Sequence, residues 1–279
     1  MQRALIDAAA VPVLGQREGR ELDRALPEWA RRSNPIVRRH LGAYWKMLTP
    51  NVGLIVRLFL LQVALVLASI AFPALLTILM PTVTVSLVLL PLAFVMYAQL
   101  LIHVGVMSAD SVVAERRNGT LDLLLVIPRS LTHILYGKVA AAVWRQVENL
   151  GMLALGVVLV SIPVLIIQND ILYSIADNPL LMRAGVILAL ASSLLRLILE
   201  PIMIGAIGTL VGAAMPLRIP ALVATLLTGV AYFAAINLVR LLPLDPFTQL
   251  LIDTVLPVVL PVVIALASFR LAARLLRRT

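Results

Sequence analysis

Two oppositely charged residues, Arg196 and Glu200, stand one helical turn apart inside a long apolar stretch. Charged side chains are costly within a membrane-spanning helix, so such residues are functional candidates by default. The pair has two interpretations. It lines a substrate path or locks two conformations, or its charges only neutralise each other within one helix. The sequence leaves both interpretations open.

The other residues that could do chemistry are scattered. Arg145 and Glu148 are three residues apart at the start of an apolar run, where a long charged side chain reaches the membrane interface. His103 has no acid or second histidine nearby, which favours packing over proton transfer. The chain has no cysteine, and this excludes disulfides, thiolate catalysis and most structural zinc sites. We therefore expect no catalytic group and no metal site.

The segment 115–138 is the only long polar interruption in the apolar part of the chain. Asn118–Gly119 favours a turn, because glycine adopts positive φ without penalty. We expect a short helix after it, capped by Thr120, with Asp122 in its first turn and Pro128 at its end. Leucines occupy one side of this helix: Leu121, Leu124 and Leu125. Leucines inward and charges outward suit a docking surface for a soluble partner.

Composition assigns the broad class. Hydrophobic residues make up 61% of the 279 residues and charged residues 13%. Soluble domains carry about a quarter charged residues, so the sequence predicts an all-α integral membrane protein. The net charge of +9 does not indicate nucleic acid, because aromatic residues are not interleaved with the basic ones.

A membrane-spanning helix needs about twenty apolar residues. We expect six such spans, at about residues 57–80, 83–107, 147–168, 184–212, 219–242 and 252–269. These make up one six-span domain over residues 51–279. A polar cytoplasmic segment, 1–33, and an amphipathic interfacial helix, 34–50, precede it. That helix begins at Asn34–Pro35, with one apolar side: Val37, Leu41, Tyr44, Trp45 and Leu48.

Charge predicts the orientation. With both termini inside, the cytoplasmic segments hold nineteen of the 23 lysines and arginines. An excess of this kind on one side sets the topology. We therefore expect a multi-pass protein of the cell (inner) membrane, with both termini and segment 115–138 in the cytoplasm. Along the fourth span, Gly205, Gly208 and Gly212 predict close helix packing.

Segment 115–138 also resembles a known family. Its pattern is Glu-Arg-x-x-Gly-Thr-Leu-acid-Leu-Leu, then Pro-x-Ser, then Gly-Lys, and it is similar to the first cytoplasmic loop of ABC type-2 transporter permeases. The matching residues are Glu115, Arg116, Gly119, Thr120, Leu121, Asp122, Leu124, Pro128, Ser130, Gly137 and Lys138. Two positions depart from the family pattern: Asp122, where glutamate is more frequent, and Arg117, in a slot that is often acidic. Asn34–Arg39 is similar to the elbow helix of the same family.

The resemblance implies a function. In that family the loop carries a coupling helix that contacts a separate ATP-binding subunit, and two permeases work with two such subunits. The chain would be the permease of an exporter and would form a homodimer or pair with a second permease. ATP and magnesium would bind to the partner. Gly137–Lys138 lacks the remaining residues of a phosphate loop, so we expect the chain itself to hydrolyse no ATP.

Two other classes stay open. In an ion-coupled secondary transporter, Glu200 would bind the coupling ion, although the paired repeats typical of that class are not evident. An intramembrane lipid-modifying enzyme would need an acidic cluster or a nucleophile–base pair at membrane depth, where this sequence offers one acid and one histidine. A hydrophobic drug, a lipid, a glycan or an ion would each be compatible as cargo.

Overall fold

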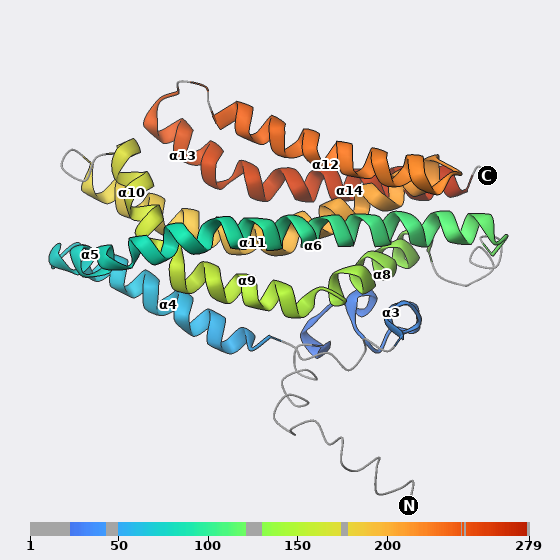
Figure 1. The fold of residues 1–279 in the computed structure, drawn as a ribbon, viewed down its shortest axis with the longest axis horizontal. Helices are drawn as coiled ribbons and strands as arrows, with labels where there is room; N and C mark the ends of the chain where they lie inside the picture. Colours follow the sequence, from blue (N-terminus) through green and yellow to red (C-terminus); the bar gives the residue numbers. More distant parts are fainter. Residues whose placement is uncertain are drawn as a thin grey trace, which may run out of the picture.

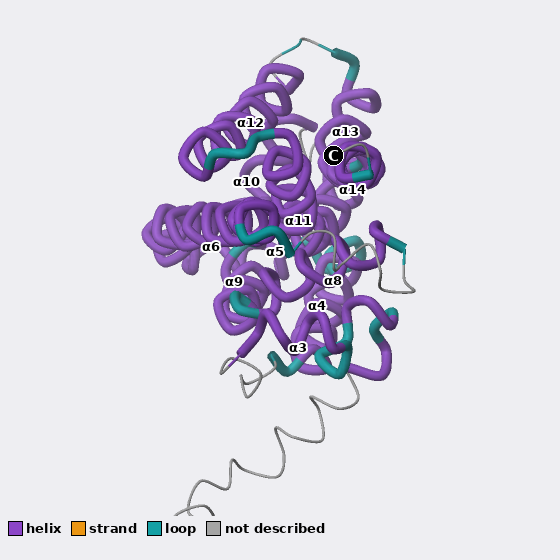
Figure 2. Tube along the Cα trace, turned by 90° about the vertical axis from the view of Figure 1, so that its right-hand side faces the viewer, coloured by secondary structure: helices purple, strands orange, loops and turns teal. Residues whose placement is uncertain are grey.

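A computed structural model describes residues 23–42, 50–120, 130–173, 178–240, 242 and 244–277. Within these residues the chain consists of helices and their connections, without a strand (Figure 2). The expectation of an all-helical protein is therefore confirmed for this part of the chain. Residues 1–22 of the expected N-terminal segment lie outside it.

Several helices are long and apolar enough to cross a membrane. Four qualify singly among the described residues: α6 (Val83–Arg117), α11 (Pro179–Ala214), α12 (Arg218–Arg240) and α14 (Leu256–Leu276). A fifth crossing is possible if α8 (Leu131–Trp144) and α9 (Val147–Val160) form one span, with a bend of 65° between them. The chain is thus a multi-pass membrane protein with four or five candidate spans by length and composition.

The expected first and third spans are interrupted in the structure. Helix α4 (Val52–Ala68) has 17 residues and ends before a short break, after which α5 (Ala74–Leu79) begins. Seventeen residues rise about 25 Å, less than the roughly 30 Å of the hydrocarbon core. The third expected span, 147–168, divides into α9 and α10 (Ile162–Tyr173). Prolines explain both breaks, since Pro73 and Pro163 cannot donate the helical hydrogen bond.

The other expected spans correspond to helices with different bounds. Helix α6 continues ten residues beyond the expected end at 107, and α11 extends on both sides of 184–212. Helix α12 covers nearly the expected fifth span. The sixth region begins with α13 (Pro246–Thr254), which Asp245 caps by accepting a hydrogen bond from the Thr248 N–H at 3.0 Å. Helix α14 follows it directly.

Helix α11 occupies the centre of the bundle. It packs against α6, α14, α10, α12, α8 and α9, so most of the other helices contact it directly. Figure 1 shows α6, α11, α12 and α14 running nearly side by side along the long axis of the molecule. Residues 115–120 and the C-terminus lie at one end, and α10 and α13 lie at the other (Figure 1).

The backbones of α6 and α11 approach closely at the glycines. A Cβ atom on Gly208 would lie 2.6 Å from the Gly105 carbonyl oxygen, and one on Gly212 would lie 2.7 Å from that of Ala109. One on Gly205 would lie 2.6 Å from a Val139 methyl carbon of α8. The expected close packing is thus confirmed, and it occurs within the chain.

The N-terminal helix α3 (Pro35–Leu41) lies against α8. The Asn34 side chain caps it by accepting a hydrogen bond from the Ile36 N–H at 3.0 Å. Val37 and Leu41 are buried in a cluster that includes Trp144 of α8. The expected apolar side therefore faces protein at these two positions. Its other members, Tyr44, Trp45 and Leu48, lie outside the described residues.

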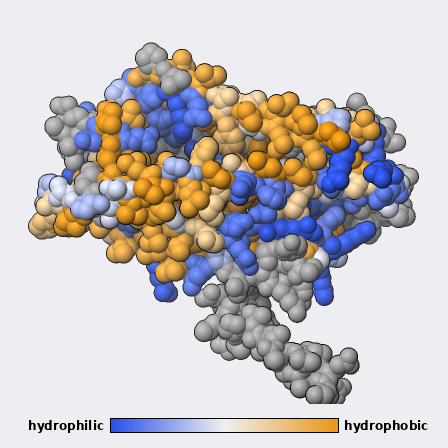
Figure 3. Space-filling view, viewed as in Figure 1, coloured by the Kyte–Doolittle hydropathy of each residue, from blue (hydrophilic) through white to orange (hydrophobic). Residues whose placement is uncertain are grey.

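Apolar and hydrophilic side chains occupy different parts of the surface. Apolar side chains cover much of the face in Figure 3, and hydrophilic ones gather where α3 and α8 lie and again over α10 and α13. Large apolar residues are exposed on α4, on the first half of α6 and on α12, for example Leu61, Phe94 and Leu227. Such exposure is expected of helices in contact with lipid.

The glycine contact gives a stability prediction. Gly208→Ala should destabilise the chain by about 1–3 kcal/mol, because the new methyl group meets backbone that cannot rotate away. The midpoint of thermal unfolding in detergent measures this. Gly156→Ala is the matched control: no atom lies within 4 Å of its Cβ position, so its midpoint should not fall. Equal midpoints for the two variants would contradict the close approach.

Candidate functional site

Glu200 lies at the centre of a polar network between three helices. Its side chain is fully buried on α11. One carboxylate oxygen accepts a hydrogen bond from Tyr97 of α6, with 2.5 Å between the oxygen atoms. The other oxygen lies 2.7 Å from Arg196 Nε and 3.4 Å from the Tyr232 hydroxyl of α12. The carboxylate therefore joins α6, α11 and α12.

The Arg196 side chain is less buried than that of Glu200. Its side chain retains 24% of its exposure, against 0% for Glu200. Only its Nε pairs with Glu200, so the two terminal nitrogens of the guanidinium remain available to other groups. The expected pairing within one helix is present, but the tyrosines on neighbouring helices show that it is not an isolated pair.

A second buried ion pair joins the two ends of segment 115–138. Lys138 of α8 is 4% exposed, and its ammonium group pairs with the Glu115 carboxylate of α6. The same ammonium also donates to the Ser111 carbonyl at 3.4 Å. Glu115 thus has a partner within the chain, and the two ends of the segment are held together.

The residues that follow Glu115 are anchored too. Arg116 donates a hydrogen bond to the Ala213 carbonyl near the end of α11, at 3.2 Å. Gly119 has φ +65°, a conformation that glycine adopts without strain, so the predicted turn is present. The Thr120 N–H donates to the Glu115 carbonyl at 3.0 Å. The rest of the expected helix, with Leu121, Asp122, Leu124 and Pro128, lies outside the described residues.

Residues near the N-terminus contact the C-terminal end of α8. The indole N–H of Trp144 donates to the Ala30 carbonyl at 2.7 Å, and the Arg32 guanidinium lies 5.1 Å from the Trp144 ring centre. Arg145 donates to the His40 carbonyl, so it is tied to α3. Burial, followed by the charges of Lys138, Arg39 and Arg145, lowers the pKa of His40 to about 4. His40 is therefore neutral at physiological pH.

Sequence reasoning missed several members of these networks. Tyr97 and Tyr232 are far from Glu200 in the sequence, and nothing at their positions marks them as its partners. Arg183 is buried and donates to the Ser69 hydroxyl and carbonyl, each at 2.9 Å. Burial of an arginine beside the end of another helix has no local sequence signal.

The structure gives no support for a metal centre in the part of the chain that it describes. No group of three or more histidine, cysteine or acidic side chains is close enough there to hold a metal ion. His103 is exposed, and its Nδ1 lies 2.8 Å from the Gln99 carbonyl in its own helix.

No protein-family model, curated protein or solved structure matches this chain.

The Glu200 network gives a second prediction. Arg196→Leu should lower the free energy of unfolding by roughly 3 kcal/mol, because it leaves a buried carboxylate without its cation. Replacing both Arg196 and Glu200 by leucine should cost less, since no buried charge remains. Thermal unfolding of the single and double variants in detergent measures the difference. A double variant less stable than Arg196→Leu would refute this account of the pair.

Transport by the same double variant separates the two interpretations of the pair. If the charges only neutralise each other, transport in membranes should persist. If they line a path or form a switch, the variant should insert normally and transport poorly.

Proposed function

We propose that this chain is the membrane-spanning permease subunit of an ATP-driven ABC transporter, working as an exporter. The segment 115–138 would couple it to a separate ATP-binding subunit. The proposal takes its family from the residue pattern of that segment. The contacts at the two ends of the segment support its role in coupling.

The buried Glu115–Lys138 ion pair is the observation that carries the proposal. It joins the end of α6 to α8, and both helices pack against α11. A force applied between Glu115 and Lys138 would therefore act on α6 and α8 together. Arg116 adds a direct contact with the end of α11. This is the connection that a coupling element needs in order to move the membrane helices.

The proposal includes the finer architecture. Six crossings would result if α4 and α5 form the first span and α9 with α10 the third, beside α6, α11, α12 and α14. Helix α3 would be the start of an elbow helix at the membrane surface. Its exposed Arg38 and Arg39 suit anionic lipid headgroups. Both termini and segment 115–138 would be cytoplasmic in the cell (inner) membrane.

The proposed assembly has two ATP-binding subunits and two permeases. The second permease would be another copy of this chain or a similar protein. ATP and magnesium would bind to the ATP-binding subunits and not to this chain. We propose no enzymatic activity for the chain alone and no nucleic-acid partner.

One observation favours a second candidate function, an ion-coupled secondary transporter. Glu200 is a fully buried acid in a membrane-spanning helix, with two tyrosine hydroxyls and an arginine around it, and acids at that depth often mark the path of a coupled ion. The two candidates differ in their energy source. Transport in vesicles that requires ATP and survives collapse of the ion gradients favours the ABC assembly, and the reverse favours secondary transport.

The coupling role can be tested at Gly119. Gly119→Pro should change how the chain leaves α6, because proline fixes φ near −65° and Gly119 has φ +65°. We expect near-normal expression, weaker co-purification with the ATP-binding subunit and loss of transport. Asn118→Ala is the control, since its φ of −85° suits any residue. Transport that survives Gly119→Pro, or that proceeds without an ATP-binding subunit, would exclude a coupling role.

The orientation has its own test, made simple by the absence of cysteine. Single cysteines at Asn118 and Asn178 should react with an impermeant reagent from opposite sides of the membrane. We expect the Asn118→Cys variant to be labelled only after permeabilisation. Labelling of that variant in intact cells would contradict the orientation and the docking of a cytoplasmic subunit.

A further inference from the structure

A polar cavity lies at the end of the bundle away from residues 115–120. Its volume is about 130 Å³, and α10, α11, α12 and α13 line it. Figure 3 shows a hydrophilic patch in this region, over α10 and α13, beside large apolar areas. Polar side chains make up much of the lining: Gln168, Asn169, Tyr173, Arg196, Arg240 and Asp253. Such a gathering is unusual in a bundle as apolar as this one.

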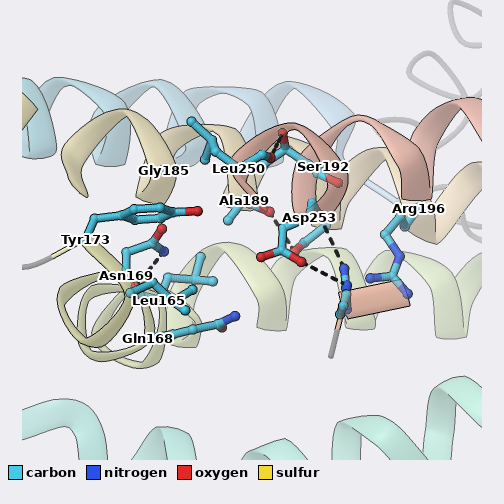
Figure 4. A pocket seen from close by; sticks show the side chains of 14 residues that line it. Leu165, Gln168, Asn169, Tyr173, Gly185, Ala189, Ser192, Arg196, Leu250 and Asp253 are labelled. Carbon is cyan, nitrogen blue, oxygen red and sulfur yellow. Dashed lines mark hydrogen bonds and ion pairs between the residues drawn. The ribbon is translucent and has the colours of Figure 1, made fainter. Parts of the chain in front are cut away.

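Three groups in the lining have donors without a hydrogen-bond partner among the described residues: Tyr173, Arg196 and the Nε–H of Arg240, which is ion-paired with Asp253. Tyr173 is 4% exposed, and its buried hydroxyl has no hydrogen-bond partner among the described residues. Arg196 uses Nε for Glu200, and its terminal nitrogens have no partner within the same part of the chain. The tyrosine and the guanidinium enter the cavity from opposite sides (Figure 4). A buried donor without an acceptor costs free energy, which a ligand acceptor would relieve.

Both arginines of the lining are paired with an acid, so an anion would bind through unused guanidinium N–H groups and not through an excess of positive charge. Arg240 lies 3.2 Å from Asp253 through its Nε, so the one acid of the lining is neutralised within the cavity wall. Its terminal nitrogen also donates to the Asp253 carbonyl at 3.3 Å. Arg196 is paired in the same way with Glu200, which lies outside the lining, and its terminal nitrogens have no partner among the described residues. A guanidinium edge matches the two oxygens of a carboxylate or phosphate.

The exposed apolar side chains around the cavity indicate what kind of molecule would carry such an anion. Apolar side chains near its lining on α10 and α11 are exposed, including Ile171, Leu172 and Leu188. They would contact acyl chains if the helices stand in a membrane. The volume suits one anionic group and not a whole amphiphile. A lipid-like molecule would place its headgroup inside and its chains outside.

We propose that this cavity binds one oxyanion group, a phosphate or a carboxylate, carried by the headgroup of an amphiphile. The Arg196 guanidinium is its principal donor and the Tyr173 hydroxyl its second. Binding itself does not depend on the proposed transport function. Only the assignment of the bound amphiphile as cargo rests on that function.

The test measures binding to the purified full-length chain in detergent, with no ATP-binding subunit present. The probes are dihexanoyl phosphatidylglycerol, dihexanoyl phosphatidylcholine and inorganic phosphate. A ligand that binds only the folded chain raises the thermal midpoint in a saturable way. We expect saturable stabilisation by phosphatidylglycerol and little by phosphatidylcholine. Stabilisation by inorganic phosphate alone would keep the oxyanion site and overturn the amphiphile as its source.

Two conservative variants locate the site. Arg196→Lys keeps the positive charge beside Glu200 but loses the planar edge, and Tyr173→Phe removes only the hydroxyl. Each should weaken phosphatidylglycerol binding roughly tenfold, the loss of about one hydrogen bond to a charged group. Each shift is compared with the midpoint of the same variant without ligand, so a change in stability does not mimic a change in binding.

The matched controls lie at the opposite end of the bundle. Arg218→Lys alters an exposed arginine paired with Asp110, and Tyr136→Phe alters a tyrosine packed on Phe269. Both should bind as the unmodified chain does. No saturable binding of any anion, equal binding of phosphatidylcholine, or full binding by both cavity variants would overturn the proposal. Weakening by Arg196→Lys alone would keep the site and remove Tyr173 from it.

Discussion

The close approach of α6 and α11 is the constraint on which the rest of the structure depends. At Gly208 and Gly212 the backbone of α11 leaves no room for a side chain between it and the α6 carbonyls. This contact fixes the position of α11 along the axis of α6. It therefore also decides that Tyr97, two turns before Gly105 on α6, reaches the carboxylate of Glu200. Since α10, α12 and α14 pack on α11, their positions depend on the same contact.

Buried polar groups supply what apolar packing cannot. In a membrane, lipid is as apolar as the helix surfaces, so apolar area alone does not select one arrangement of helices. Here Glu200 joins α6, α11 and α12, the Lys138–Glu115 pair joins α6 and α8, and Arg183 joins α11 to the end of α4. Each of these contacts links segments far apart in the sequence. Each also satisfies a group that would be costly to leave without a partner.

The two candidate functional regions lie along one helix, α11, one near its end and the other over its first half. Near its end, α11 receives Arg116 from the segment proposed for coupling. Nearer its start, it supplies Arg196 to the polar cavity. Arg196 also contacts Glu200, so the cavity is connected to the network that binds α6 and α12. A displacement of α11 relative to α6 would therefore change both regions together, and it would have to disrupt the close backbone contact at Gly208 and Gly212.

The sequence alone determined the class of protein, the turn at Gly119, the cap at Asn34, and the close packing at Gly208 and Gly212. These features depend on composition or on residues within one turn of helix, so local physical chemistry predicts them. It also identified Arg196 and Glu200, because charge in an apolar run is visible locally. Only the tertiary structure supplied Tyr97 and Tyr232 to that pair, Lys138 to Glu115, and Tyr173 and Arg240 to the cavity. It also showed that the expected spans 57–80 and 147–168 are interrupted. Hydropathy stays high across the prolines in these stretches, although each proline ends the helical hydrogen bonding. Partners across helices follow from how the helices pack, and a hydropathy pattern carries no record of which tyrosine or lysine a neighbouring helix will present.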